Sequence, residues 1–371
     1  MISGTKKWNE GDAPFKEPAA SNNPVEILKQ NSELWDLFAR KEEYAPGLRD
    51  RHSRFPHYLS AQGNCLEARA SQYLQEHGCS MTYPEGRRFA VCLTHDIDCV
   101  YISKDCMLDV LKNLGNQPGA RANLALRMPF YLLRQKSNPI WNFEKIMNLE
   151  REYGAKSTFF FLAAERDLGR GTNYRIEDLK DELQQIRAGG WSVGLHCGYY
   201  SYDQLAELAK EKLRLEKVLG GKVAGCRNHY LRFKVPDTWE LLSQAGFKYD
   251  ATFGYADFAG FRNGMCHPFK PFNLKTEKVI DIWEIPLAIM DGTLFDYMSL
   301  DAAGAWQITR LLIDTVEKLG GVITILWHNT YMLGESIKYY RKILDYCQEK
   351  NAWMTSCDDL YDWYDRQTTD L

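Results

Sequence analysis

From residue 89 onward, short apolar runs alternate along the chain with segments of helical periodicity. Eight runs rich in apolar, β-branched or aromatic residues predict strands, and they lie at 89–94, 157–162, 191–195, 223–227, 247–250, 279–285, 322–327 and 352–355. Runs that are apolar throughout are typical of parallel strands covered on both faces. Seven or eight strand–helix units in succession favour a (β/α) barrel over an open doubly wound sheet.

The predicted helices between these runs have recognisable ends. Residues 201–204 (Ser-Tyr-Asp-Gln) have the pattern of a capping box, and the apolar stripe that follows stops at the glycines 220–221. Residues 236–237 (Pro-Asp) predict the start of another helix, which closes near Gly246. The first strand–helix unit carries no glycine fingerprint for a dinucleotide or a P-loop, so we expect no organic cofactor.

Residues 1–85 have a mixed pattern and predict a mostly helical extension, with helices at 24–41 and 66–77. No chemical constellation is visible there, and its histidines (52, 57 and 77) have the character of ordinary surface residues. The barrel is expected over 86–371, with an insertion at about 103–138. The basic, aromatic segment 127–134 within that insertion indicates a lid or substrate wall, or a helix packed outside the barrel.

Composition narrows the class of protein. The 371 residues are 45% hydrophobic and 26% charged, which is enough to bury a large core. A formal net charge of -3 gives no global reason to expect nucleic acid or an anionic membrane as a partner, although local patches remain possible.

Cysteine usage and hydropathy bear on the location of the protein. The ten cysteines include no C-x-x-C pair and several lie in apolar runs, so we expect reduced, buried thiols. The N-terminus lacks the apolar core of a signal peptide, and no segment approaches the ~20 apolar residues of a membrane span. A cytoplasmic location is therefore expected.

Ionisable residues follow several of the predicted strands directly. The carboxyl ends of the strands in a parallel barrel open on one face, so these side chains are expected to share a site. Imidazole and carboxylate groups suit Zn²⁺ or a similar divalent ion, and a spare carboxylate and imidazole could act as base and acid in a metal-dependent hydrolase. The residues are His95, Asp96, Asp98, His196, Arg227, His229, Asp291 and His328.

In four segments the chain resembles the polysaccharide deacetylase superfamily, the NodB-homology or carbohydrate esterase family 4 group. The resemblance extends from about residue 87 to about residue 360. Residues 94–98 (THDID) match the first motif in its D-x-D form, and 194–196 (GLH) match the second. Residues 227–230 (RNHY) match the third motif and 326–328 (LWH) the last, in the order that the family has.

The resemblance implies a distorted (β/α)7 barrel that removes acetyl groups from N-acetylated sugars with the help of a bound divalent metal. It assigns Asp98 and His196 as metal ligands. It assigns catalytic roles to five further residues: Asp96 as the general base, Arg227 as its fixed cationic partner, Tyr230 as an oxyanion donor through its backbone N–H, His328 as the general acid, and Asp291 as the acid that orients His328. For Asp291 an exposed loop aspartate is the alternative.

One ligand of the family pattern is missing. The second motif usually reads H-x-x-x-H, but Tyr200 stands four residues after His196. We rank His229, which ends another strand, as the first candidate for the third ligand, with His95 second and water as the remaining option. Without a substitute, the site would bind metal weakly or act without it, as allantoinase-like members of the superfamily are thought to do.

The sequence thus favours a cytoplasmic hydrolase that removes an N-acetyl or O-acetyl group from a sugar or polysaccharide precursor. Zn²⁺ is the expected metal, with Co²⁺, Ni²⁺ or Mn²⁺ as alternatives. Aromatic segments near the motifs fit a carbohydrate partner, with Arg262 and Asp257 as candidate hydroxyl ligands. The alternatives are a hydrolase of a small non-sugar amide, which a closed pocket would favour, and a catalytically silent carbohydrate-binding barrel.

Overall fold

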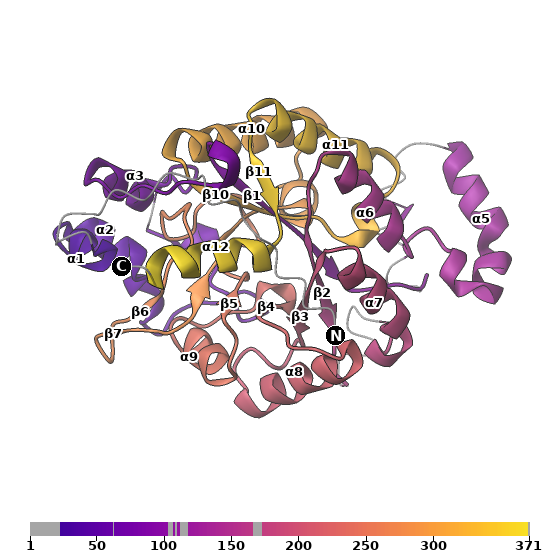
Figure 1. Cartoon of the computed structure of the whole chain (residues 1–371), viewed down its shortest axis with the longest axis horizontal. Helices are drawn as coiled ribbons and strands as arrows, with labels where there is room; N and C mark the ends of the chain where they lie inside the picture. The colour runs from indigo at the N-terminus through magenta and orange to yellow at the C-terminus, as the bar shows by residue number, and fades with distance from the viewer. Residues whose placement is uncertain are drawn as a thin grey trace.

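The structure is a computed structural model that describes residues 23–61, 63–102, 107, 110–111, 118–165 and 173–369. A curled sheet of parallel strands lies at its centre, with helices around it (Figure 1). The strand order is β8-β5-β4-β3-β2-β1-β10-β9, with β11 also paired to β1. The strands are β1 (Ala90–Ile97), β2 (Thr158–Leu162), β3 (Ser192–Cys197), β4 (Gly225–Asn228), β5 (Tyr249–Asp250), β8 (Trp283–Glu284), β9 (Leu287–Met290), β10 (Val322–Leu326) and β11 (Trp353–Thr355).

This sheet confirms the predicted distorted (β/α) barrel. Every strand pairing in it is parallel, and within the described residues no ladder joins β8 to β9, so the barrel is not closed. The helices that accompany the strands are α6 (Phe143–Glu152), α7 (Lys180–Ala188), α8 (Leu205–Leu219), α9 (Asp237–Gln244), α10 (Ala302–Leu319), α11 (Gly334–Glu349) and α12 (Cys357–Thr369).

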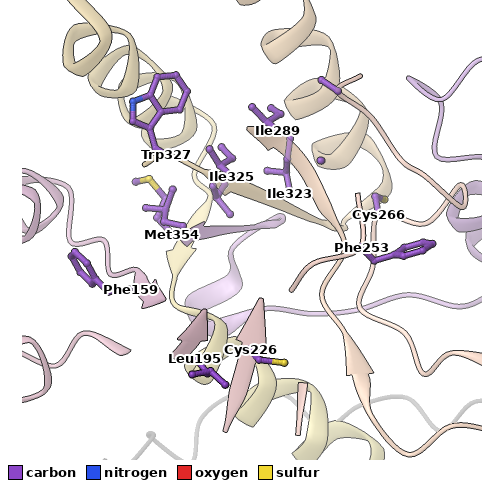
Figure 2. Packing of buried hydrophobic residues seen from close by; sticks show 14 of the residues in the cluster. Phe159, Leu195, Cys226, Phe253, Cys266, Ile289, Ile323, Ile325, Trp327 and Met354 are labelled. Atoms are coloured by element: carbon purple, nitrogen blue, oxygen red, sulfur yellow. The ribbon is translucent and has the colours of Figure 1, made fainter. Parts of the chain in front are cut away.

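The main hydrophobic core lies between the strands and the surrounding helices. Alternate residues of each strand point outward into it, as Ile323 and Ile325 of β10 do beside Ile289 of β9 (Figure 2). Removal of these apolar surfaces from water stabilises the layer of helices against the sheet. The same alternation sends the intervening residues into the barrel.

The barrel interior holds a second, smaller cluster. It contains Cys92 of β1, Phe160 of β2 and Tyr249 of β5, together with Leu360 of α12. Large rings fit there because neighbouring strands present glycine: a Cβ on Gly225 would lie 1.9 Å from the ring of Tyr249. The small residue is therefore required by the packing of the interior.

The regular elements in the described part of the N-terminal region are helices and helical turns, and the region packs on the barrel. It contains α1 (Pro24–Lys29), α2 (Ser32–Phe38) and α3 (Arg69–Glu76), whose apolar residues join the main core. Between α2 and α3, buried Glu43 accepts hydrogen bonds from Arg40 (2.8 Å) and Arg262 (2.6 Å). The division of the chain at residue 85 stays a prediction.

Three local predictions differ from the structure. The helix expected at 24–41 is two helices, because the Asn31 side chain caps the second by accepting from Leu34 N. The capping box at 201–204 does not form, because the Ser201 hydroxyl donates to Glu211 instead. The run 279–285 divides between β7 (Lys278–Val279), which pairs antiparallel with β6 (Phe272–Asn273), and β8.

The long connection after β1 contains α5 (Pro118–Leu133), which stands apart from the barrel in Figure 1. Of the predicted insertion, 103–106, 108–109 and 112–117 lie outside the described residues.

The eight cysteines at 65, 79, 92, 197, 226, 266, 347 and 357 are free thiols, but Cys99 is in a disulfide and departs from the expectation. Among the described residues, no helix has the length and apolar character needed to cross a membrane.

Candidate metal centre and active site

Strand alternation decides which of the charged residues face the barrel interior. Cys92 on β1 packs inside, whereas Leu93 and Ile97 pack outside against the helices. Asp96 and Asp98 share the parity of Cys92, and both line a pocket at the carboxyl ends of the strands. His95 has the opposite parity and points away from them.

Asp96 on β1 is held by a guanidinium group from β4, which β2 and β3 separate from β1 in the sheet. Arg227 Nη1 lies 3.0 Å from Asp96 Oδ1 and also donates to Thr94 Oγ1 at 2.7 Å. Arg227 Nε donates to the carbonyl oxygen of Ala251 at 2.7 Å. Both charged groups are buried, so the arginine fixes the position of a carboxylate whose other oxygen, Oδ2, lies 3.6 Å from His196 Nε2.

Asp98, His196 and His229, the candidate ligand trio, place one oxygen and two nitrogens within 4.8 Å of one another. Asp98 Oδ1 is 3.3 Å from His196 Nε2 and 3.7 Å from His229 Nε2. Ligands bound to Zn²⁺ at roughly 2.0–2.2 Å in tetrahedral geometry stand about 3.3–3.6 Å apart, so these separations suit one shared ion.

Two further observations fit a cation between these groups. His196 Nδ1 lies 2.9 Å from the carbonyl oxygen of Arg227, which must accept, so the Nε2 lone pair is left for a ligand. Asp98 Oδ1 is shielded from solvent and has no hydrogen bond of good geometry. Burial opposes ionisation of Asp98, but contact with His196 and the charges of His229 and His328 outweigh it and hold its pKa well below the usual range.

His328 and Asp291 form a second pair of functional groups beside the trio. His328 Nδ1 lies 2.7 Å from Asp291 Oδ1, and the backbone N–H of His328 donates to Asp291 Oδ2 at 2.5 Å. Asp291 is completely buried, so the alternative of an exposed loop aspartate is wrong. Burial alone would lower the pKa of His328, but the Asp291 carboxylate raises it to about 10. His328 Nε2 faces Asp98 Oδ2 at 3.7 Å.

Tyr230 follows His229 in a conformation that ordinary residues rarely adopt. Its φ is +59°, and the φ of Leu231 is +53°. Left-handed backbone at two successive residues without glycine costs about 1–3 kcal/mol each and persists only where neighbours enforce it. Arg54 supplies one such contact, because its Nη1 donates to the Tyr230 carbonyl at 2.8 Å.

Arg54 and His52 come from the N-terminal region, where the sequence indicated no chemistry. Arg54 is buried, bonds Asp50 at 2.7 Å through Nε, and lines the pocket that contains Asp96 and Asp98. The His52 ring stacks on Tyr230 with ring centroids 4.6 Å apart. The segment 50–54 therefore forms one wall of the site. The many charged residues in 49–54 (Arg-Asp-Arg-His-Ser-Arg) were the one sign in the sequence that this segment could border a site. A local pattern cannot show which distant residues such a segment contacts.

The pocket has a volume of about 180 Å³, which is small for a ligand site. Its lining includes side chains that the sequence motifs did not indicate. These are Arg54, Met290, Asp296, Tyr297, Thr330 and Tyr331.

Other residues that the sequence singled out lie elsewhere. His95 lies between the carbonyl oxygen of Trp327 (2.6 Å) and Glu150 (2.8 Å) on the outer face of β1, so it is not placed to join the trio. Tyr200 is 40% exposed and lines a different hollow. Arg262 is buried against Glu43, and Asp257 accepts from the backbone N–H of His57, so neither lines this pocket.

Comparisons with known proteins bear on the fold. No family model and no curated protein sequence matches the chain. A solved structure from Mycobacterium smegmatis, assigned as a polysaccharide deacetylase, superposes with a TM-score of 0.54 at 17% identity, over 78% of this chain and 95% of that one. The structure of Puue allantoinase superposes with a TM-score of 0.52 at 14% identity, over 86% and 98%. At these identities the superpositions show a similarity of fold, which confirms the distorted (β/α) barrel that the resemblance implied.

Proposed function

We propose that this chain, which has the fold of the NodB-type deacetylases, is a metal-dependent hydrolase that removes an acetyl group from the nitrogen or oxygen of a sugar. One observation carries the proposal: two polarised acid–base pairs adjoin the same ligand trio. Asp96, paired with Arg227, lies 3.6 Å from His196. His328, paired with Asp291, lies 3.7 Å from Asp98. A silent binding protein would need neither pair.

In this proposal Asp98, His196 and His229 would hold a divalent ion, with Zn²⁺ favoured and Co²⁺, Ni²⁺ or Mn²⁺ as alternatives. Such an ion would polarise the acetyl carbonyl and lower the pKa of a water molecule. Asp96 accepts the proton of the attacking water through Oδ2, because Oδ1 is engaged by Arg227. Arg227 holds this carboxylate in position until the proton arrives.

His328 supplies a proton to the departing nitrogen as the C–N bond breaks. The raised pKa of His328, about 10, keeps its imidazole protonated at neutral pH, and Asp291 holds the ring so that Nε2 faces the site. The backbone N–H of Tyr230 is proposed to donate to the oxygen of the tetrahedral intermediate. Arg54 would support this role by holding the Tyr230 peptide in its left-handed conformation.

The narrow pocket favours a small substrate or the end of a glycan over the interior of a polysaccharide. Segment 50–54 closes one side, and a volume of about 180 Å³ leaves little room beyond the acetyl-bearing group. Tyr230 and Tyr297, which are partly exposed at the pocket, offer rings on which the apolar face of one sugar could stack. The same narrowness supports a small non-sugar amide as the second candidate substrate.

Replacement of Asp96 by Asn tests the proposed reaction. The variant should retain the metal content of the native protein, because Asp96 is not in the trio, and lose at least about 10²-fold in acetate release. Metal content is measured by elemental analysis, and acetate release with N-acetylglucosamine, its oligomers and small acetamides. Exposed Asp203→Asn is the matched control and should behave as the native protein.

Two outcomes would reject the deacetylase. One is native protein without stoichiometric metal and without acetate release from any substrate. The other is an Asp96→Asn variant as active as the native protein. If the protein hydrolyses small acetamides but no acetylated sugar, the substrate is the second candidate, a small non-sugar amide.

We also propose a cytoplasmic location. Eight described cysteines are free thiols, which favours a reducing compartment, whereas the disulfide at Cys99 argues against it.

A further inference from the structure

Helix α5 carries two apolar stripes, and only one of them packs against the protein. Leu124, Met128 and Tyr131 recur at i, i+4 and i+7; Leu124 and Tyr131 pack in a small cluster with Ile140 and Leu333, and Met128 on the same face is half-buried. A helix needs one such stripe to attach to a domain. The second stripe therefore requires a separate explanation.

The second stripe consists of Leu126, Phe130 and Leu133, again at i, i+4 and i+7. These side chains are 82%, 45% and 86% exposed, and Leu132 beside them is 63% exposed. Among the described residues, four of the thirteen exposed large hydrophobic side chains thus lie on this one helix. Such a concentration marks an interaction surface, because single exposed apolar residues are normally scattered. Figure 1 shows α5 standing clear of the barrel, with room on its outer side.

Charge around α5 identifies the kind of partner. Residues 110–143 contain five Lys or Arg residues and no Asp or Glu, a local charge of +5. Because the whole chain carries -3, the other residues sum to -8. Arg127 and Arg134 border the outer stripe, and neither forms an ion pair with any residue that the structure describes. The helix thus presents leucines and a phenylalanine with two cations along one side of the stripe, and Arg134 lies over the Phe130 ring at 5.8 Å.

A hollow of about 570 Å³ at the end of the helix adds to this pattern. Leu133 and Arg134 line it together with Tyr101 and with Lys136, which is paired with Glu182 at 2.8 Å, so Arg134 is the basic group there without an ion pair among the described residues. Basic groups beside exposed apolar side chains match the two layers of a bilayer surface, where phosphates lie above acyl chains.

We propose that α5 is an interfacial helix that binds the surface of an anionic phospholipid membrane. The Leu126, Phe130 and Leu133 side chains enter the boundary between headgroups and acyl chains, and Arg127 and Arg134 contact lipid phosphates. This role is peripheral, since α5 has 16 residues and bears charges within its length. It is independent of the proposed deacetylase reaction, because it uses none of the residues of the site.

Co-sedimentation with vesicles tests this proposal. The intact protein should sediment with vesicles of phosphatidylcholine containing about one third phosphatidylglycerol, and much less with pure phosphatidylcholine. Leu126→Ser combined with Phe130→Ser should weaken binding by about tenfold or more. Arg127→Gln combined with Arg134→Gln should weaken it by roughly fivefold for each arginine removed, and added salt should have a similar effect.

The matched control replaces exposed leucines on other helices. Leu213→Ser on α8 combined with Leu311→Ser on α10 removes two side chains that are 63% and 45% exposed, and vesicle binding should be unchanged. Circular dichroism verifies that each variant is folded. Equal sedimentation of native protein with neutral and anionic vesicles, or no sedimentation with either, would overturn the proposal. So would a native dimer that Leu126→Ser/Phe130→Ser converts to monomer without any vesicle binding, since the stripe would then join two copies.

Discussion

Strand parity separates the three histidines that were candidates for the metal site. His196 lies at an interior position of β3, and His229 follows β4 directly. His95, in contrast, lies on the exterior side of β1. His95 instead belongs to a buried network in which Glu150 also accepts from Ser157, Trp191 and Tyr340. Alternation within THDID was visible in the sequence, and it could have removed His95 from the ligand candidates.

Replacement of His229 and replacement of His95 should have different effects on metal binding. His229→Ala should lower Zn²⁺ affinity by more than the roughly 10- to 100-fold that follows loss of an outer partner, because it removes a ligand of the trio. His95→Phe should leave Zn²⁺ affinity unchanged. Calorimetric titration of metal-free protein measures both. Equal affinity losses in the two folded variants would contradict the assignment of the trio.

At the scale of elements, a residue of α3 and the residue that ends α10 both contact His267, which is held in its neutral form. His267 Nδ1 lies 3.0 Å from the Ser71 hydroxyl, and its Nε2 lies 3.2 Å from the Gly320 carbonyl, which must accept. Burial lowers the pKa of His267 to about 4. The ring was expected to be structural, and its contacts join α3, the end of α10 and the segment before β6.

This histidine predicts a pH dependence of stability. Its pKa is about 4 when folded and near 6.5 when unfolded, so the unfolded chain binds more protons between those values. The free energy of unfolding should therefore fall as the pH drops from about 6.5 to about 4, and this histidine should contribute about 1–3 kcal/mol of that loss. His267→Gln should flatten the dependence in urea unfolding between pH 7 and pH 4.5. An unchanged slope would mean that the ring becomes protonated without cost in the folded protein.

At the scale of the whole molecule, the N-terminal region completes the site as well as the core. Arg54 contacts Tyr230 across 176 positions of sequence, and Glu43 contacts Arg262 across 219. Burial would raise the pKa of Glu43, but the charges of Arg262 and Arg40 outweigh it and lower that pKa. The wall made by 50–54 thus depends on an ion cluster that anchors the segment before it.

Loss of the Glu43 charge should loosen this connection. Glu43→Gln leaves two buried arginines without their carboxylate, so the free energy of unfolding should fall by about 3–5 kcal/mol. Glu33→Gln is the control, because it breaks the exposed pair with Arg69 and should cost no more than about 1 kcal/mol. Urea unfolding measures both variants. A similar small loss in both would show that the extension is held by apolar packing alone.

The sequence by itself determined the run of parallel strands, the barrel class and the residues that gather at the carboxyl ends of β1, β3, β4 and β10. These follow from local periodicity, because alternate residues of a strand share a face and parallel strands end on one side. Only the tertiary structure decided that Asp291 is buried against His328, that Arg54 walls the pocket and that Arg262 is paired with Glu43. Those contacts join segments that are far apart in the sequence. Their geometry depends on how the whole chain packs, and a local sequence pattern cannot predict it.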